Sequence, residues 1–329
     1  MQHAEKIRLL TAGRDLSTSS GLEIGPRESP LITRAHGPVL YADYTDTATI
    51  RATLPHPSID PARVVEIDIV TGGGKLSAAM AQRVDYIVAS HVAEHVPDLL
   101  GWLADLHLVL KPGGTLGLAI PDRRFTFDRY RAESTIAEAV EAFVLEYQRP
   151  SLRQIFDSAW QAIPMEVAEG WRGGPDEAAS LRHRLAKLPL ALQLVRDVHA
   201  SGRYNDAHCW VFTPASFLEF FDHAAQLALL PYVMEAFQPT EQGGYEFYTV
   251  FRRAEGDHAA ETENSIRRAR EVLAASPAEP AFAAAHPGSG AKALRAENEA
   301  LRESLAVMRN SRFWRLTGPV RRFLEALRG

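Results

Sequence analysis

The sequence predicts an α/β protein built on a doubly wound parallel sheet. Apolar segments with many β-branched residues alternate with helical segments along the first half of the chain, which is typical of repeated βαβ units. Residues 84–120 contain one complete unit, in which an apolar strand, a Leu-rich helix, a Lys-Pro-Gly-Gly turn and a second apolar strand follow each other. Parallel strands joined in this way require a right-handed crossover.

Three strands are expected before this unit. Residues 21–25 (GLEIG) form the first, and residues 38–44 (PVLYADY) form the second, followed by a helix over residues 45–54. Residues 64–70 (VVEIDIV) form the third, and a glycine-rich turn then leads into a helix near residues 76–81. Strands that alternate with helices in this order predict a sheet with helices on both faces.

Local signals assign the elements of the complete unit. Residues 85–89 are apolar and partly β-branched, as expected of a buried parallel strand. A Pro-Asp pair suits the start of a helix whose leucines form a broad apolar face. Residues 111–114 (KPGG) then stop the helix and turn the chain, and residues 115–120 form the next strand.

A helical insertion follows the unit. Residues 129–206 are partly amphipathic, with breaks expected at Pro150, Pro164, residues 173–175 and Pro189. This segment is long for a connection between two strands. We therefore expect an added group of helices in this range.

The sheet is expected to close with a hairpin. Thr213 and Pro214 start a helix that runs to Leu227. Residues 229–237 and 245–252 are apolar and are joined through a pair of glycines, which is typical of two antiparallel strands. With the five earlier strands, they bring the predicted sheet to seven.

The C-terminal part of the chain has a different composition from the body. We predict that the domain covers residues 1–253 and that residues 254–290, rich in Ala, Glu, Pro and Gly, form a flexible linker with one helix near residues 266–273. Residues 291–310 are expected to form a short coiled coil. Residues 311–329 form a basic, amphipathic tail that suits an anionic membrane surface or a protein partner.

The coiled-coil prediction rests on a heptad spacing. Leu294, Leu301 and Met308 repeat every seven residues, with Asn298 and Leu305 at the other core position. A single Asn in that position favours a parallel dimer. We therefore expect a homodimer formed through this segment.

Bulk composition excludes several classes of protein. The net charge of −5 shows no nucleic-acid footprint. The single cysteine, Cys209, excludes an internal disulfide and a cysteine-based zinc site. The N-terminus lacks the apolar core of a signal peptide, and no stretch reaches the ~18 apolar residues of a membrane span. We expect a cytoplasmic protein, or one that is peripheral at the inner membrane through its basic tail.

The central motifs resemble those of a known family. The segments DYIVASHVAEHV, LKPGG and AIPDRRFTFDRYR, in this order, resemble the second half of a class I S-adenosylmethionine (SAM) methyltransferase. The extended segments are similar to methyltransferase-like proteins of bacterial polysaccharide gene clusters, and the resemblance covers residues 20–253. It implies a seven-stranded Rossmann-like methyltransferase sheet, SAM as cofactor, and an insertion that caps the acceptor site.

The loop after the first strand is expected to hold the cofactor. Glu23, Gly25 and Pro26 stand where the family has its glycine-rich loop, which allows backbone amides to approach the ligand. Arg27 and Ser29 occupy the second and third glycine positions of that loop. This departure keeps open a second reading, in which the fold has lost SAM.

Residues at the ends of the next strands complete the predicted cofactor site. Asp43, followed by Tyr44, ends the second strand, where a carboxylate can accept both ribose hydroxyls. The resemblance places Asp68 and Ile69 at the adenine edge and Ser90 near the methyl group. Asp43 in a purely structural role would instead cap a turn.

The candidate catalytic residues follow the fourth strand. Methylation of an aliphatic hydroxyl requires a base, and histidine titrates near neutral pH. We predict that His91 or His95 is this base and that Glu94 orients one of the two imidazoles. Asp122, which leaves the fifth strand at the same edge, is an alternative base.

The pattern His-x-x-Glu-His has other interpretations. It also occurs in inverted zincin peptidases, but there both histidines lie on a helix, whereas His91 follows a strand. Ubiquinone-type O-methyltransferases have acidic residues and a Glu-His pair here that can hold a divalent metal. His91 replaces the first acid and is a poorer ligand for Mg²⁺, so we predict no metal site. Glu94 and His95 in a structural role would cap the following helix.

Further residues are candidates for contact with the acceptor. Arg123 or Arg124 could bind a phosphate or carboxylate of a glycan. His208 and Trp210 resemble another family segment near the acceptor, where an aromatic ring could stack on a sugar. The structural alternatives are a salt-bridged turn and a core tryptophan.

These patterns lead to one main functional prediction and one alternative. The main prediction is a SAM-dependent methyltransferase that O-methylates a sugar during the synthesis of a surface polysaccharide or a lipid-linked glycan. Its partners would be the small-molecule or glycan acceptor and a glycosyltransferase complex or membrane surface. The alternative is a catalytically inactive methyltransferase-fold scaffold that recruits a glycan-assembly complex.

Overall fold

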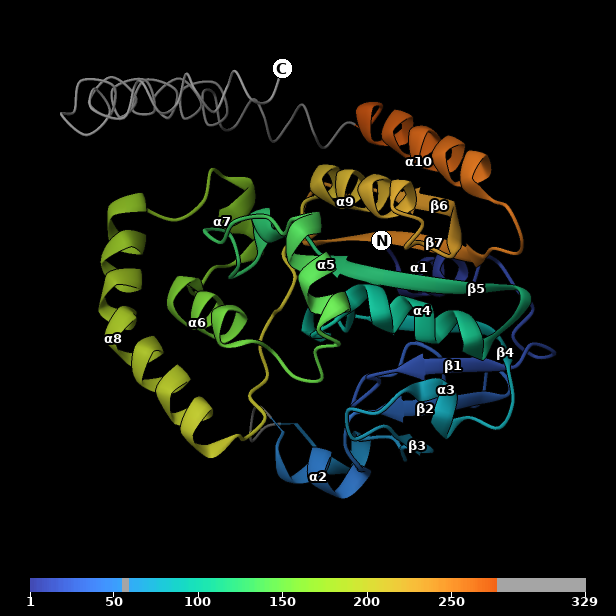
Figure 1. Ribbon diagram of the computed structural model, residues 1–329, viewed down its shortest axis with the longest axis horizontal. Coiled ribbons are helices and arrows are strands. Elements are labelled where there is room, and N and C mark those ends of the chain that lie inside the picture. The colour runs from blue at the N-terminus through green and yellow to red at the C-terminus, as the bar shows by residue number, and fades with distance from the viewer. Residues whose placement is uncertain (55–58, 277–329) are drawn as a thin grey trace, which may run out of the picture. The chain divides into compact units, whose positions relative to one another are not determined.

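The computed structural model describes residues 1–54 and 59–276. These residues contain one seven-stranded sheet with the strand order β3-β2-β1-β4-β5-β7-β6 (Figure 1). β1 to β5 are parallel, and β7 is antiparallel to both β5 and β6. The strands are β1 Gly21–Ile24, β2 Val39–Asp43, β3 Ile69–Val70, β4 Val84–Ser90, β5 Leu110–Pro121, β6 Tyr232–Gln238 and β7 Glu246–Arg253. The predicted fold class is therefore confirmed.

Helices connect these strands and form the insertion. The α-helices are α1 His3–Leu10, α2 Thr47–Ala52, α3 Leu76–Ala79, α4 Leu99–Val109, α5 Ile136–Val144, α6 Leu152–Gln161, α7 Val167–Trp171, α8 Glu177–Ser201, α9 Pro214–Gln226 and α10 Ala259–Ala274. The short 3₁₀ helices are η1 Pro61–Arg63, η2 Ala93–His95 and η3 Arg123–Phe125. In the described residues, no helix is both long and apolar enough to cross a membrane.

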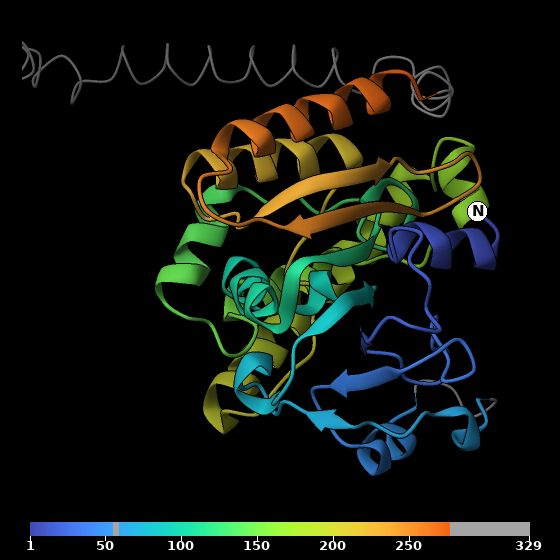
Figure 2. The same cartoon turned by 90° about the vertical axis from the view of Figure 1, so that its right-hand side faces the viewer.

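Both faces of the sheet are buried, which explains the continuous apolar strands. Ile87 and Ala89 of β4 belong to the main core with α4, α9 and α10, whereas Tyr86 and Val88 belong to a smaller core beneath α1. Successive side chains of a strand point to opposite faces, so β4 serves both cores. Figure 2 shows α9 and α10 together over one part of the sheet and α1 near β5 and β7.

The boundaries of β3 and β5 differ from the predicted ones. Only Ile69 and Val70 of the expected third strand pair with β2, because the backbone N–H of Val65 donates to Arg27 and that of Ile67 donates to Thr47. The predicted turn at residues 111–114 lies inside β5, where it bulges out of the ladder while Leu110 and Thr115 still pair with β4. Partners outside the sheet shortened β3, whereas pairing with β4 on both sides of the glycine pair lengthened β5.

The insertion consists of α5 to α8, and one predicted break in it is wrong. Pro189 lies inside α8 rather than ending it. Proline removes one intrahelical hydrogen bond and kinks a helix, and α8 continues through it with a bend (Figure 1). α6 and α8 share a small apolar cluster that includes Ile155 and Val198.

The packed unit extends beyond the predicted linker boundary. α10 covers more residues than the expected helix at 266–273, and its Ile266 and Ala269 are buried in the main core. Thr262 donates to the Tyr232 carbonyl, and Met234 donates to the Ser265 hydroxyl. Residues 259–274 therefore belong to the folded unit. The predicted coiled coil and basic tail lie outside the described residues.

Candidate active site

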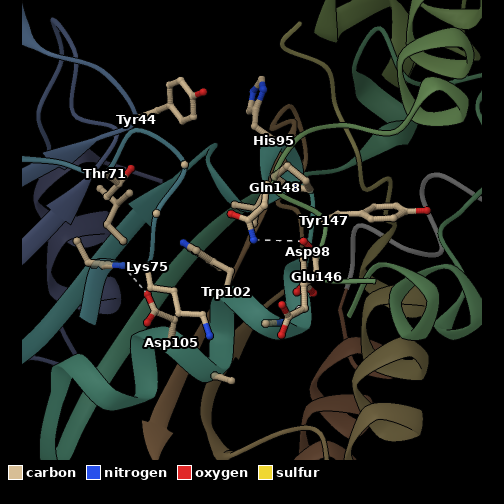
Figure 3. A pocket seen from close by; sticks show the side chains of 18 of the residues that line it. Tyr44, Thr71, Lys75, His95, Asp98, Trp102, Asp105, Glu146, Tyr147 and Gln148 are labelled. Atoms are coloured by element: carbon tan, nitrogen blue, oxygen red, sulfur yellow. Dashed lines mark hydrogen bonds between the residues drawn. The ribbon is translucent and has the colours of Figure 1, made fainter. Parts of the chain in front are cut away.

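A large cavity of about 640 Å³ lies at the carboxyl ends of β1 and β2. Its wall combines these strand ends, the turn after β3, the start of α4, the end of α5 and one residue that follows α8. Figure 3 shows Tyr44, Thr71 and Lys75 across this cavity from His95, Tyr147 and Gln148. In doubly wound folds the ligand binds at the carboxyl ends of the strands. The lining residues used below are Ile24, Asp43, Tyr44, Thr71, Gly73, Lys75, Val92, His95, Trp102, Tyr147, Gln148 and Tyr204.

Asp43 and Tyr44 are both in the cavity wall. Asp43 ends β2, and its carboxylate accepts the backbone N–H of Thr45 at 3.3 Å. Burial raises the pKa of Asp43 above its ordinary value. Tyr44 stacks on Tyr204, with ring centroids 4.6 Å apart. The segment after α8 therefore brings an aromatic ring over the cofactor side of the sheet.

The loop after β1 has left-handed backbone at two of the family's three glycine positions. Gly25 has φ +68°, and a Cβ there would lie 2.7 Å from Val92 Cγ2. Arg27 also has a positive φ, +46°, although it carries a side chain. Pro26 is buried between them. Arg27, at the family's second glycine position, thus has a backbone conformation that suits glycine.

Glu23 fastens this loop instead of lining the cavity. Its two carboxylate oxygens accept the backbone N–H groups of Leu31 and Ile32, each at 2.8 Å. Burial raises the pKa of Glu23 to about 7, against the opposing effect of these two hydrogen bonds. The predicted cofactor contact of Glu23 is therefore indirect, through the position of the loop.

Five other predicted cofactor residues lie outside the lining of both cavities: Gly25 and Pro26 of the loop, and Asp68, Ile69 and Ser90. Asp68 is exposed, pairs with Arg34 at 2.8 Å and accepts the Tyr41 backbone N–H. Ile69 packs against the main core, and Ser90 pairs with β5 in the sheet. The wall at this place is formed by Thr71, Gly73, Lys75 and Trp102, which the sequence reasoning missed. The Thr-Gly-Gly-Gly turn was the available signal.

A smaller cavity of about 270 Å³ adjoins the first. His95 lines both cavities. The lining residues of the smaller cavity are His91, Glu94, His95, Pro121, Phe125, Thr126, Phe127, Met165, Val167, His208 and Tyr245. The predicted catalytic motif and the insertion therefore meet at one place.

His91 is held between two carboxylates. Its Nε2 lies 2.8 Å from Glu246, and its Nδ1 lies 3.4 Å from Glu94. Burial alone would lower the pKa of His91, but the hydrogen bond to Glu246 and the nearby Glu94 carboxylate raise it to about 9. The same ion pair, helped by Lys6, lowers the pKa of Glu246 to about 2 against the opposing effect of burial. An imidazole with this pKa is protonated at neutral pH, which favours His95 over His91 as the predicted base.

His95 has a different partner from the one expected. Its Nδ1 lies 2.9 Å from Asp206, and its ring meets that of His208 edge to face at 4.6 Å. Burial lowers the pKa of His95, but Asp206 raises it above its ordinary value. Asp206 therefore orients this ring. Glu94, which was expected to orient one of the two imidazoles, faces His91 instead.

Asp122 does not fit the role of an alternative base. Its side chain is fully buried, pairs with Arg124 at 2.6 Å and accepts the Thr240 hydroxyl at 2.7 Å. Arg123 donates to the carbonyl of Arg129. The turn after β5 is therefore an internal salt-bridged turn. Trp210 is likewise a core residue, and its indole N–H donates to the Val96 carbonyl.

Comparison with known proteins identifies the family. The family model described as "Methyltransferase domain" matches residues 4–231. The chain belongs to this methyltransferase family. The predicted enzyme class, a SAM-dependent methyltransferase, is therefore confirmed, and its cofactor is SAM. No curated protein matches the sequence.

The solved structures to which this chain is similar have low sequence identity to it. The CcbJ methyltransferase from Streptomyces caelestis is 12% identical over 77% of this chain and 97% of that chain, with a TM-score of 0.38. The N-methyltransferase NodS from Bradyrhizobium japonicum WM9, in complex with S-adenosyl-L-homocysteine (SAH), is 14% identical over 77% and 86%, with a TM-score of 0.34. A SAM-dependent methyltransferase from Mesorhizobium loti is 13% identical over 73% and 93%, with a TM-score of 0.35. Family membership rests on the family model.

The residues of the larger cavity fit SAM. The Asp43 carboxylate can accept the two ribose hydroxyls. Tyr44 and Trp102 offer aromatic surface for the adenine. Gly25 lies behind the wall, against Val92, which lines the cavity. The methyltransferase thus retains a cofactor cavity although its loop has one of the usual glycines.

Proposed function

We propose that this methyltransferase transfers a methyl group from SAM to a sugar hydroxyl during the synthesis of a surface polysaccharide or a lipid-linked glycan. The observation that carries the proposal is the junction of the two cavities at His95. SAM supplies an electrophilic methyl group when bound. The smaller cavity then receives the acceptor, with one wall shared between donor and acceptor.

The lining of the smaller cavity favours a polar acceptor with an apolar face. Phe127 and Tyr245 offer aromatic rings on which a sugar ring can stack, and Glu94, His95 and His208 supply polar groups. An acceptor hydroxyl must lose its proton during methyl transfer. These three polar side chains are the groups that can orient the hydroxyl, and the Glu94 carboxylate or a neutral imidazole can accept its proton. The choice of a surface glycan follows the resemblance of the central motifs.

The cofactor assignment is tested by calorimetric titration of the purified protein with SAM and with SAH. Asp43→Ala removes hydrogen bonds to a charged group, each worth about 1.5–3 kcal/mol, so we expect affinity for both ligands to fall by at least roughly 10-fold. Asp68→Ala is the matched control, because that carboxylate points to Arg34. Unchanged affinity in Asp43→Ala, or equal losses in both variants, would contradict the assignment.

The acceptor assignment needs a separate experiment. Surface polysaccharide and lipid-linked glycan are extracted from cells that lack this gene and incubated with the enzyme and methyl-labelled SAM. We expect label in an O-methyl sugar after acid hydrolysis, and a loss of labelling with His95→Asn but not with the exposed control His199→Asn. Label that appears on a nitrogen atom, or on no glycan, would refute the sugar hydroxyl.

We also propose that residues 291–310 pair two chains and that residues 311–329 bring the enzyme to a glycosyltransferase complex or to the cytoplasmic membrane surface. The heptad spacing and the arginine-rich, aromatic tail support this proposal. The net charge of −5 argues against nucleic acid as a partner.

A further inference from the structure

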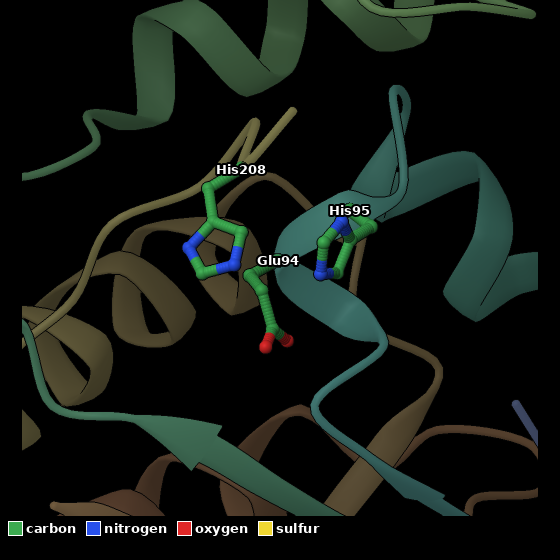
Figure 4. Close-up of side chains that lie close together, drawn as sticks. All are labelled: Glu94, His95 and His208. Atoms are coloured by element: carbon green, nitrogen blue, oxygen red, sulfur yellow. The ribbon is translucent and has the colours of Figure 1, made fainter. Parts of the chain in front are cut away.

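Three potential metal ligands converge on the wall of the smaller cavity. Glu94 and His95 belong to η2, and His208 comes from the segment between α8 and α9. One ligand atom from each residue lies within 4.8 Å of the others. Figure 4 shows both imidazole rings close to the Glu94 carboxylate. The chain therefore brings a carboxylate and two imidazoles together from distant parts of the sequence.

Glu94 is a buried carboxylate whose charge is only partly balanced. Its side chain is 1% exposed, and neither oxygen has a hydrogen-bond partner within residues 1–54 and 59–276. Its nearest cation, His91 Nδ1, is 3.4 Å from one oxygen, which is long for a hydrogen bond between charged groups. A buried charge of this kind is costly unless it is paired or coordinates a metal. A cation bound next to Glu94 would balance this buried negative charge.

Both histidines are oriented as metal-binding histidines usually are. His95 Nδ1 is 2.9 Å from Asp206, and His208 Nδ1 is 2.5 Å from Asp128, which Arg131 holds in turn at 2.9 Å. Metal-bound histidines commonly place the other ring nitrogen on a carboxylate, which fixes the ring and raises its basicity. The Nε2 atoms of both rings are then the ones left for coordination.

We propose that Glu94, His95 and His208 form a binding site for a divalent transition-metal ion of the Zn²⁺ type. Two imidazoles and one carboxylate suit Zn²⁺, Mn²⁺ or Fe²⁺, whereas Mg²⁺ and Ca²⁺ prefer oxygen ligands. Three protein ligands beside a cavity leave a coordination position for water or substrate, as in catalytic sites. A metal in this place can polarise an acceptor hydroxyl; this role, unlike the binding itself, rests on the proposed function.

Metal binding is tested on the full chain after treatment with a chelator. Calorimetric titration with Zn²⁺ and the visible absorption of added Co²⁺ each report binding without any need for methyl transfer. We expect one equivalent to bind. Glu94→Gln and His208→Asn should each lower the affinity by at least roughly 100-fold, and Asp206→Asn should lower it by roughly 10–100-fold, the range found for outer-shell partners. His199→Asn, on the exposed side of α8, should leave the affinity unchanged.

Thermal unfolding provides a second measurement on the same variants. A ligand that binds only the folded state raises its stability, so Zn²⁺ should raise the unfolding temperature of the wild-type protein and of His199→Asn but not of Glu94→Gln. Glu94→Gln keeps the size of the buried side chain and removes its charge, while His91 keeps its hydrogen bond to Glu246, so this variant is expected to fold. No binding by the wild-type protein, or equal binding by the wild-type, Glu94→Gln and His208→Asn proteins, would overturn the proposal, because the second result means adventitious binding by exposed histidines.

Discussion

Two residues beside the cavities have backbone conformations that few side chains adopt. His91 has φ +54° and Gly25 has φ +68°. Left-handed conformation costs a side-chain residue roughly 1–2 kcal/mol, and such residues often cluster at functional sites. At His91 the conformation accompanies the ion pair with Glu246. At Gly25 it brings the loop against Val92, which lines the larger cavity.

Gly25→Ala should lower both stability and SAM affinity. The alanine would have a left-handed backbone, and its Cβ would lie 2.7 Å from Val92 Cγ2. We therefore expect a loss of unfolding free energy larger than the roughly 1–2 kcal/mol that the backbone conformation alone costs. Gly13→Ala is a matched control, because Gly13 has φ +66° and open space around it. Chemical denaturation and calorimetry check both effects. Equal stability losses in the two variants would show that the Val92 contact is unimportant.

At the scale of elements, a buried carboxylate ties the end of β1 to the segment after it. Glu23 binds the backbone of Leu31 and Ile32, which belong to the smaller core. This link holds the loop of residues 25–30 next to the cofactor cavity. Glu23, which the sequence suggests as a cofactor contact, thus acts indirectly by fixing the conformation of this loop.

The raised pKa of Glu23 predicts that stability falls as the pH rises. Its folded-state pKa of about 7 exceeds the ordinary value of 4.5, so the stabilisation is complete below about pH 4.5 and is lost as pH rises toward 7. At about 1.4 kcal/mol per pKa unit, this loss is about 3 kcal/mol. Denaturation at pH 5 and pH 8 should show it in the wild-type protein.

The variant that isolates this effect is Glu23→Gln. The amide cannot titrate, so its pH dependence should be smaller than that of the wild-type protein. It should also be destabilised at pH 5 by about 1–3 kcal/mol, because its NH₂ group faces a backbone N–H. Glu219→Gln, on the exposed side of α9, serves as the control. A Glu23→Gln protein with the full wild-type pH dependence would assign the effect to other groups.

At the scale of the whole molecule, a helix that composition assigns to a linker completes the main core. α10 packs on α9 and β6 and buries Ile266 and Ala269. It also satisfies backbone groups of β6 at Tyr232 and Met234. The folded unit therefore needs more of the chain than the seven strands alone.

A chain truncated after residue 280 should keep the stability and SAM affinity of the full chain. A chain truncated after residue 253 should lose at least about 3 kcal/mol of unfolding free energy, because one buried isoleucine alone contributes about 1.5–3 kcal/mol. Thermal and chemical denaturation of both truncated chains provide the comparison. Equal stability of the two would mean that α10 is dispensable.

Deletion of residues 281–329 should also convert a dimer to a monomer. The heptad segment lies in this range, and a short coiled coil of its length is the predicted contact between chains. Light scattering of the full and shortened chains measures the mass directly. An equal number of chains per particle in both samples would exclude the coiled-coil dimer.

Local patterns in the sequence determined most of the fold, but only two of the predicted cofactor residues, Asp43 and Tyr44, line the larger cavity. Apolar strand segments, turn glycines and the Thr-Pro helix start report short-range preferences, so the strands and the closing hairpin were predictable. Asp43 and Tyr44 were found because the end of a parallel strand is a local feature that the fold always points toward the ligand.

Only the tertiary structure decided the chemistry of the smaller cavity. His91 meets Glu246 of β7, His95 meets Asp206, and His208 comes to lie beside Glu94. Asp122 is fully buried, whereas Pro121 beside it lines the smaller cavity. These pairings join residues far apart in the sequence. A local pattern carries no information about such partners, and partners determine burial, charge and the direction of each pKa shift.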